Sequence, residues 1–107
     1  MSIVDEVEVI DNERYNLVDI VDKAERFTIS VTNLKSHQST RGNIHSEPEI
    51  YYFLGECKLL LDGVPYPMAS GSMFVVPPDV HHQVMNSSDG LVTFLTLFSG
   101  TRSQKHK

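Results

Sequence analysis

Two histidines and one glutamate stand at the starts of β-rich segments, where their side chains could meet around a metal ion. His45 and Glu49 precede the apolar run Ile50–Leu54, and His82 opens the run His82–Met85. Imidazole nitrogens and carboxylate oxygens suit Fe, Mn, Ni, Co and Zn, and a set of only three protein ligands leaves coordination positions open for a substrate. The trio therefore points to a divalent transition-metal site.

The spacing around Glu49 places further residues on the same side of a strand. Asn43, His45 and Glu49 have the same parity of residue number, so they would face one side of a continuous strand. Tyr51 and Phe53 continue that parity and would line the interior beside the metal, as substrate-binding residues or simply as core.

The elements that must position these residues are predicted to be strands. Asp62–Gly63 is the clearest hairpin turn, because a type I′ turn needs positive φ at both central residues. Residues Tyr15–Arg26 allow a helix with Leu17, Ile20 and Val21 on one face, or an extended segment. About eight short strands separated by turns indicate an all-β sandwich or small barrel. Runs with a two-residue repeat or high β-propensity are Val7–Ile10, Phe27–Leu34, Ile50–Leu54, Cys57–Leu61, Met73–Val76, His82–Met85 and Leu91–Phe98.

Composition narrows the classes of partner. The 107 residues suffice for one domain, residues 1–107, with loosely ordered ends at residues 1–6 and 101–107. The net charge is −5, and residues 1–100 carry six basic against 14 acidic side chains, about −8, which argues against nucleic acid. The single cysteine, Cys57, is read as a buried apolar side chain and excludes an internal disulfide. No signal peptide or long apolar stretch is visible, which predicts a soluble cytoplasmic protein without membrane contact.

The segment from Gly71 to Asn86 resembles the second conserved motif of the cupin superfamily, G-x5-P-x-G-x2-H-x3-N. Gly71, Pro77, His82 and Asn86 stand at the required offsets. Asp79 stands where the motif has its second glycine, and aspartate tolerates the left-handed backbone conformation that this position implies. Asn86 is expected to tie the end of its strand through hydrogen bonds to the backbone.

The first cupin motif, G-x5-H-x-H-x3-4-E-x6-G, is matched in part. His45 fits its second histidine, Glu49 fits its glutamate, and Gly55 comes one residue early. Asn43 stands where the motif has its first histidine. An amide oxygen is a weak ligand, so this departure predicts a weaker site with one more open position.

The resemblance covers about residues 35–98 and implies an antiparallel double-stranded β-helix, the jelly-roll or cupin barrel. Members of the superfamily usually hold a divalent metal through three histidines and one glutamate. Carried over by position, the ligands here are His45, Glu49 and His82, with Asn43 in the fourth place. His37 would replace the missing histidine only if the loop between it and Asn43 folds back.

Two other polar side chains near these motifs have open roles. Arg41 lies just before the first motif, where it either orients an anionic ligand or is solvated. His81 should point away from the face that His82 uses, which predicts an exposed side chain.

The resemblance leaves several functions open, because one fold serves many chemistries. The leading hypothesis is a metal-binding cupin that acts on a small polar carbonyl or carboxylate compound, including sugar-derived ones. This rests partly on the likeness of Gln38–Gly42 to small cupins of carbohydrate metabolism. The alternatives are a non-catalytic module that binds or senses a small molecule, and an empty structural barrel. A homodimer is also expected, because the strand Val7–Ile10 outside the motif-bearing core would leave an unpaired edge.

Overall fold

The computed structural model describes residues 6–22, 26–44 and 46–99, and these residues form an antiparallel all-β structure. The described residues contain no helix, and therefore none long and apolar enough to cross a membrane. The ends that were expected to be loose fall, apart from Glu6, outside the described residues, as does His45. The strands are β1 (Glu6–Asp11), β2 (Tyr15–Asp22), β3 (Phe27–Leu34), β4 (Glu49–Phe53), β5 (Cys57–Leu61), β6 (Val64–Met68), β7 (Met73–Val76), β8 (His82–Met85) and β9 (Val92–Ser99).

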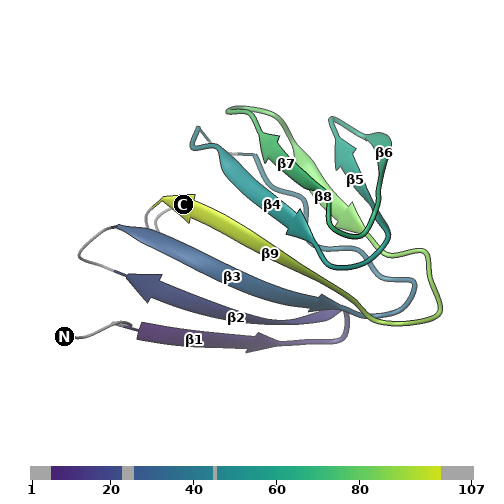
Figure 1. Cartoon of the computed structure of the whole chain (residues 1–107), viewed down its shortest axis with the longest axis horizontal. Helices are drawn as coiled ribbons and strands as arrows, with labels where there is room; N and C mark the ends of the chain where they lie inside the picture. The colour runs from purple at the N-terminus through teal and green to yellow at the C-terminus, as the bar shows by residue number, and fades with distance from the viewer. Residues whose placement is uncertain (1–5, 23–25, 45, 100–107) are drawn as a thin grey trace.

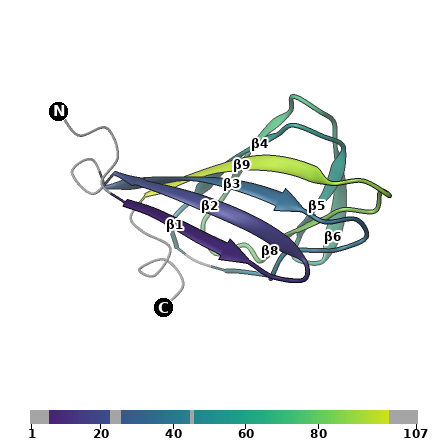
Figure 2. The same ribbon diagram turned by 90° about the horizontal axis from the view of Figure 1, so that it is seen from below.

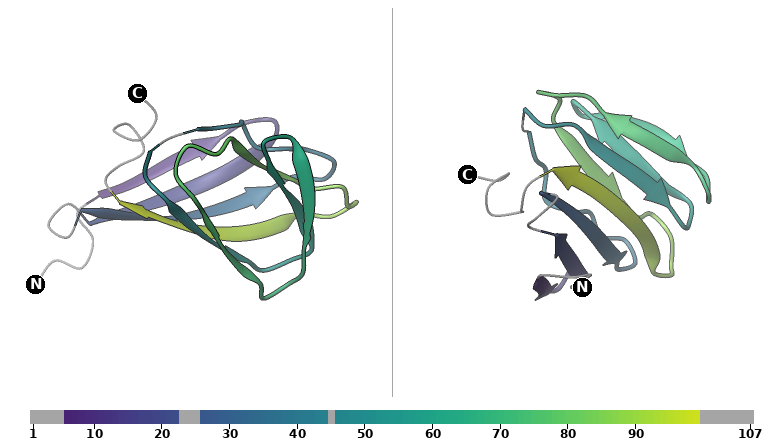
Figure 3. Two further views of the ribbon diagram at one scale, coloured as in Figure 1. Left: turned by 90° about the horizontal axis from the view of Figure 1, so that it is seen from above. Right: turned by 60° about the vertical axis from the view of Figure 1, so that its left-hand side comes forward.

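Two sheets face each other, as in a jelly roll. The larger sheet has the order β1-β2-β3-β9-β4-β7, and the smaller has the order β6-β5-β8. In Figure 1 the strands β5, β6 and β8 lie near β4 and β7, whereas β1, β2 and β3 lie on the other side of β9. The segment 38–43 extends the smaller sheet, because Ser39 bridges to Met85 and Asn43 bridges to His82. Figure 3 shows the two sheets enclosing the barrel.

Turn chemistry explains where the strands reverse. Asp62 and Gly63 both have positive φ, at 49° and 81°, so the predicted type I′ hairpin between β5 and β6 is confirmed. Asp79 has φ 62° and Gly71 has φ 88°. The aspartate at position 79 thus adopts the left-handed conformation that a glycine would supply, as the sequence indicated.

The helical alternative for Tyr15–Arg26 is wrong, and the extended one is correct up to Asp22. Residues 15–22 form β2, with Leu17, Asp19 and Val21 buried on the inner face. The buried Asp19 masks the two-residue repeat of apolar side chains that would have identified a strand. Val18 and Ile20 lie on the other face, so β-branched residues occupy both sides of β2 and favour the strand. All seven predicted strands are present, with ends shifted by at most one residue.

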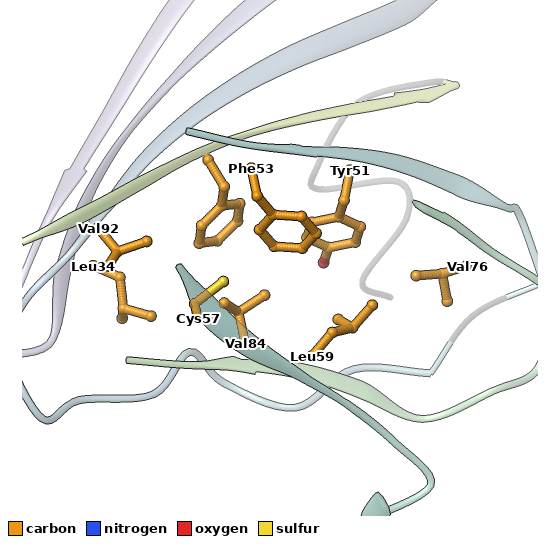
Figure 4. Packing of buried hydrophobic residues seen from close by; sticks show 9 residues of the cluster. Leu34, Tyr51, Phe53, Cys57, Leu59, Val76, Val84 and Val92 are labelled. Atoms are coloured by element: carbon orange, nitrogen blue, oxygen red, sulfur yellow. The ribbon is translucent and has the colours of Figure 1, made fainter. Parts of the chain in front are cut away.

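The apolar core lies between the sheets and fills the barrel next to the conserved motifs. Figure 4 shows Tyr51 and Phe53 side by side, with Val76 at one end of the cluster and Leu34 and Val92 at the other. Rows of side chains at alternate positions of β4, β5, β8 and β9 point into this core. Its buried members are Leu34, Tyr51, Phe53, Cys57, Leu59, Val76, Val84, Val92 and Phe94.

Cys57 is one of these core residues, which confirms its reading as a buried side chain. Burial raises the pKa of the Cys57 thiol from its ordinary value of 9.0 to about 11. At pH 8 this shift makes the thiolate fraction about 100-fold smaller than in the unfolded chain. We therefore expect a maleimide or iodoacetamide to modify the native protein at least about 100-fold more slowly than the protein in denaturant, as measured by intact mass. Equal rates would contradict the buried position.

Candidate metal centre

Glu49 and His82 meet inside the barrel. Glu49 is the first residue of β4 and His82 is the first residue of β8, and each is only 2% exposed. Glu49 Oε2 and His82 Nε2 are 3.8 Å apart. This separation is longer than a hydrogen bond, whose heavy atoms lie within about 3.2 Å of each other. Metal bonds to nitrogen and oxygen ligands are about 2.0–2.2 Å long, so two ligands of one ion lie at most about 4.4 Å apart, and this separation is compatible with one shared ion.

The second ring nitrogen of His82 fixes which atom faces Glu49. His82 Nδ1 lies 3.1 Å from the backbone oxygen of Val80. A carbonyl only accepts, so Nδ1 is the donor in this contact, and in the neutral imidazole the lone pair is then on Nε2. Metal-binding histidines are commonly held in this way, with one nitrogen donating to the backbone and the other free to coordinate.

Asn43 is the cross-strand neighbour of His82. Asn43 N–H donates to His82 O at 3.0 Å, and His82 N–H donates to Asn43 O at 2.9 Å. Residues that exchange both backbone hydrogen bonds in an antiparallel pair present their side chains on the same face. The side chain of Asn43 therefore starts on the same side as that of His82, and its Nδ2 donates to Arg41 O at 3.3 Å.

Tyr51 and Phe53 follow Glu49 along the inner face of β4. The Tyr51 ring meets His82 edge to face, with centroids 6.1 Å apart, and stacks on Phe53 at 5.7 Å. Tyr51 is thus the aromatic residue next to the candidate centre. Phe53 is fully buried one step further along the strand, where it packs on Phe94 at 5.9 Å.

The remaining candidate side chains are exposed, unlike those of Glu49 and His82. Arg41 and His81 are exposed, and the prediction for His81 is confirmed. A Cβ on Gly42 would lie 2.6 Å from Cε1 of His81, so this ring packs on the Gly42 backbone. His37 Nε2 lies 2.7 Å from Asp89 Oδ1 and is well exposed. The segment that contains His37 runs antiparallel to β8, with Asn43 next to His82 and Ser39 next to Met85. His37 therefore lies past Met85, at the far end of β8 from His82, and the idea that it replaces a ligand is wrong.

The third predicted ligand, His45, lies outside the described residues. Within residues 6–22, 26–44 and 46–99, no group of three or more His, Cys, Asp or Glu side chains is placed to hold a metal. The described part of the centre is therefore the pair Glu49 and His82, with Asn43 beside it.

The inner face of the larger sheet carries a row of buried polar side chains that was not recognised from the sequence. In register across β2, β3, β9 and β4, Asp19 pairs with Ser30, Ser30 with Thr96, and Thr96 with Tyr51. Asp19 is 0% exposed, Ser30 1% and Thr96 5%. The row leads to Tyr51, which contacts His82. The signal in the sequence was a polar residue at an inward position of each strand, which becomes visible only once β2 is read as extended.

Comparison with known proteins identifies the family to which this arrangement of strands belongs. The family model described as "Cupin domain" matches residues 30–98. The chain belongs to the cupin family. The matched region contains β4, β8 and the pair Glu49 and His82, and it extends the region of about residues 35–98 that the motifs indicated. A search of curated proteins gives no match.

Solved structures share the cupin fold over nearly the whole chain. An RmlC-like cupin from Shewanella frigidimarina is 19% identical, with a TM-score of 0.75, over 92% of this chain and 88% of its own. A predicted oxalate decarboxylase from Thermotoga maritima is 21% identical at TM-score 0.75, over 94% and 100% of the two chains. A polyketide cyclase from Streptomyces resistomycificus is 17% identical at TM-score 0.75, over 92% and 75%. At these identities the likeness shows the fold alone.

Proposed function

We propose that this cupin binds one divalent transition metal and acts on a small polar carbonyl or carboxylate compound, with sugar-derived compounds included. The observation that carries the proposal is the pairing of Glu49 Oε2 with His82 Nε2 at 3.8 Å in a buried position. Glu49, His82 and His45 are the proposed ligands, with Asn43 at the fourth position. His45 enters through its motif offset from Glu49.

The residues present fit a metal of this class. One carboxylate, one imidazole whose Nε2 faces it and a neighbouring amide are donors suited to Fe, Mn, Ni, Co or Zn. A bound ion would supply Lewis-acid polarisation of a ligand oxygen. Tyr51 would form an aromatic wall beside the bound compound, and the exposed Arg41 would orient an anionic group.

Two observations support a small polar ligand. Buried polar side chains lie in one row next to Tyr51, namely Asp19, Ser30 and Thr96. An apolar ligand would not require polar side chains beside its site. Among the similar structures are a predicted oxalate decarboxylase, named for a dicarboxylate, and a polyketide cyclase, named for a polyketide. The fold is therefore used with oxygen-rich compounds at low sequence identity.

A second candidate function is non-catalytic binding or sensing of the same class of compound. It is favoured by Asn43, which stands beside His82 in place of a histidine. A weaker metal site would suit reversible ligand binding, and apart from Glu49 no general base has been assigned. The homodimer is retained as a proposal. Location in the cytoplasm stays a prediction from composition.

Asn43→His should tighten metal binding. Imidazole is the stronger ligand for these ions, and position 43 lies directly across from His82. We expect the dissociation constant for Mn²⁺ or Co²⁺ to fall by about tenfold or more, equivalent to about 1.4 kcal/mol, in a competition titration with a chelator. Ser87→His, in the exposed loop after β8, is the control and should leave the affinity unchanged. Equal or weaker affinity in Asn43→His means that position 43 does not face the metal.

The proposed function is tested by elemental analysis of tag-free protein followed by assays of the metal-loaded protein. A panel of dicarboxylates, 2-keto acids and sugar acids is measured for binding by calorimetry and for turnover by mass spectrometry. Metal with turnover supports the enzyme, and metal with binding but no turnover supports the sensing module. Protein that neither contains nor takes up metal is a structural barrel, and the proposal then fails.

A further inference from the structure

Each sheet places an apolar residue directly beside a proposed metal ligand. On the smaller sheet, Leu61 of β5 is the cross-strand neighbour of His82. On the larger sheet, Val76 of β7 is the cross-strand neighbour of Glu49 and is fully buried. Cross-strand neighbours in an antiparallel pair present their side chains on the same face of the sheet. The centre therefore has apolar neighbours on the side of β5 and β7.

The row that contains His82 and Leu61 continues to Val64 on β6. Val64 pairs with Leu61 in register, so its side chain also starts on the inner face. Exposure rises along this row, from 2% for His82 through an intermediate value for Leu61 to 52% for Val64. In Figure 2, β6 lies beside β5 at the right of the view. The row therefore leads from the buried centre toward solvent.

Tyr66 is a second residue of β6 that starts on the inner face and is exposed. Its cross-strand neighbour Leu59 is fully buried, whereas Tyr66 is 45% exposed. The reason is position, because β6 is the free edge of the smaller sheet and β7 is a free edge of the larger one. We call Leu61, Val64 and Tyr66 the apolar lane. Apolar side chains that line a site and keep exposed surface gain free energy when a bound compound covers them.

The other side of the same row is polar. Asn43 is the cross-strand neighbour of His82 on the side away from Leu61, and the exposed Arg41 precedes it by two residues. A compound bound at the centre would thus meet an amide on one side and aliphatic side chains on the other. Such a site fits an amphipathic compound, with its oxygen atoms toward Asn43 and an apolar substituent over the apolar lane.

The turn between β5 and β6 is fixed to the residue that precedes His82. Asp62 N–H donates to His81 O at 2.8 Å, and His81 N–H donates to Asp62 Oδ1 at 3.1 Å. These two hydrogen bonds hold Leu61 and Val64, which flank the turn, in place relative to His82. The apolar lane is therefore preorganised, and little ordering is needed when a compound binds.

The sequence of β6 favours a small molecule over a protein strand as the occupant. Pro65 and Pro67 alternate with Val64 and Tyr66 along this strand. Proline has no backbone N–H, so a strand added at this edge would lack two hydrogen-bond donors. The inward apolar side chains of β6 are thus available to a compound inside the barrel, while its edge is protected against pairing.

We propose that the apolar lane sets the substrate class of the centre. The compound carries carboxylate or carbonyl oxygens at one end and a branched aliphatic or aromatic substituent at the other, as in 2-oxo acids of that kind. This inference rests on the proposed function and narrows it to amphipathic compounds. Val64 and Tyr66 are the specificity-determining residues. Full burial of one methylene group improves affinity about fourfold, so affinity rises with the size of the substituent.

The test is calorimetric titration of the Zn²⁺-loaded protein with pyruvate, 4-methyl-2-oxopentanoate and phenylpyruvate. Phenylpyruvate should bind at least about tenfold more tightly than pyruvate. Val64→Thr combined with Tyr66→Thr keeps strand-forming residues and should reduce this ratio to about threefold or less, with the affinity for Zn²⁺ unchanged. Val75→Thr is the matched control, because Val75 is 56% exposed on the outer face of β7, and it should keep the full ratio.

The outcomes separate this inference from the proposed function. If the loaded protein binds pyruvate but prefers phenylpyruvate by less than about threefold, the proposed function stands and the apolar lane has no role. Binding of dicarboxylates or sugar acids without any of the three 2-oxo acids has the same meaning. A double variant that folds and keeps the full ratio shows that Val64 and Tyr66 do not determine specificity. Protein that takes up no Zn²⁺ or other divalent metal overturns both proposals.

Discussion

His82→Ala should abolish stoichiometric metal binding. The substitution removes one of the two facing donors, which lie 3.8 Å apart in the native chain. Metal content should fall from about one ion per chain to below about 0.1, measured by elemental analysis after dialysis against the same metal. A ligand at 100 times its dissociation constant adds about 2.7 kcal/mol to the free energy of unfolding. The rise in melting temperature on adding metal should therefore disappear as well.

Two further variants separate ligation from structural damage. Glu49→Gln keeps the shape of the side chain and removes its charge, so it should also lose the metal-dependent rise in melting temperature. His81→Ala removes the adjacent exposed imidazole and should retain the ion. If His82→Ala folds and keeps full stoichiometry, or if His81→Ala loses the ion as well, the assignment fails.

Asn86→Ala should destabilise the chain strongly, even in a chelator. The side chain is fully buried and joins three parts of the backbone. Its Nδ2 shares two N–H groups among three carbonyl oxygens, Leu34 O at 3.0 Å, Lys35 O at 3.2 Å and Gly90 O at 2.8 Å. Its Oδ1 accepts from Ser88 N at 2.9 Å. Leaving several buried groups without partners costs about 1–3 kcal/mol each, so we expect a loss of about 3–5 kcal/mol in the free energy of unfolding by urea.

The neighbouring loop supplies the comparison for this variant. Ser87→Ala changes an exposed residue and should alter stability by less than about 0.5 kcal/mol. Asn86→Asp keeps an acceptor for Ser88 but removes the donor to the three carbonyls, so it should resemble Asn86→Ala. A loss below about 1 kcal/mol in Asn86→Ala would mean that water replaces these contacts. The predicted role of Asn86 as a structural tie is confirmed by its hydrogen bonds.

Local patterns predicted the strands because period and turn chemistry are local properties. The Asp62–Gly63 hairpin needs only two residues that tolerate positive φ, and both adopt it. The motif offsets placed Asn43 among the candidate ligands, and the fold sets it opposite His82. The all-β class and the cupin family were therefore accessible from the sequence.

Properties that depend on pairing between distant strands were not accessible. Asp19 could be recognised as buried only after β2 was aligned with β3 and β9, because its polarity argues for the surface. The apolar outer side of the six-stranded sheet can likewise be recognised only after its strands are aligned in register. The contact between His37 Nε2 and Asp89 Oδ1 joins residues 52 positions apart, so the distance of His37 from Glu49 and His82 could not be inferred from the sequence.

Anomalous diffraction from crystals grown with Mn²⁺ or Co²⁺ tests the central claim most directly. The account predicts one strong anomalous peak per chain within coordination distance of Glu49 Oε2 and His82 Nε2, with the imidazole of His45 on the same ion. A peak at other residues, or an ordered barrel interior without a peak at saturating metal, would contradict the metal centre at Glu49 and His82.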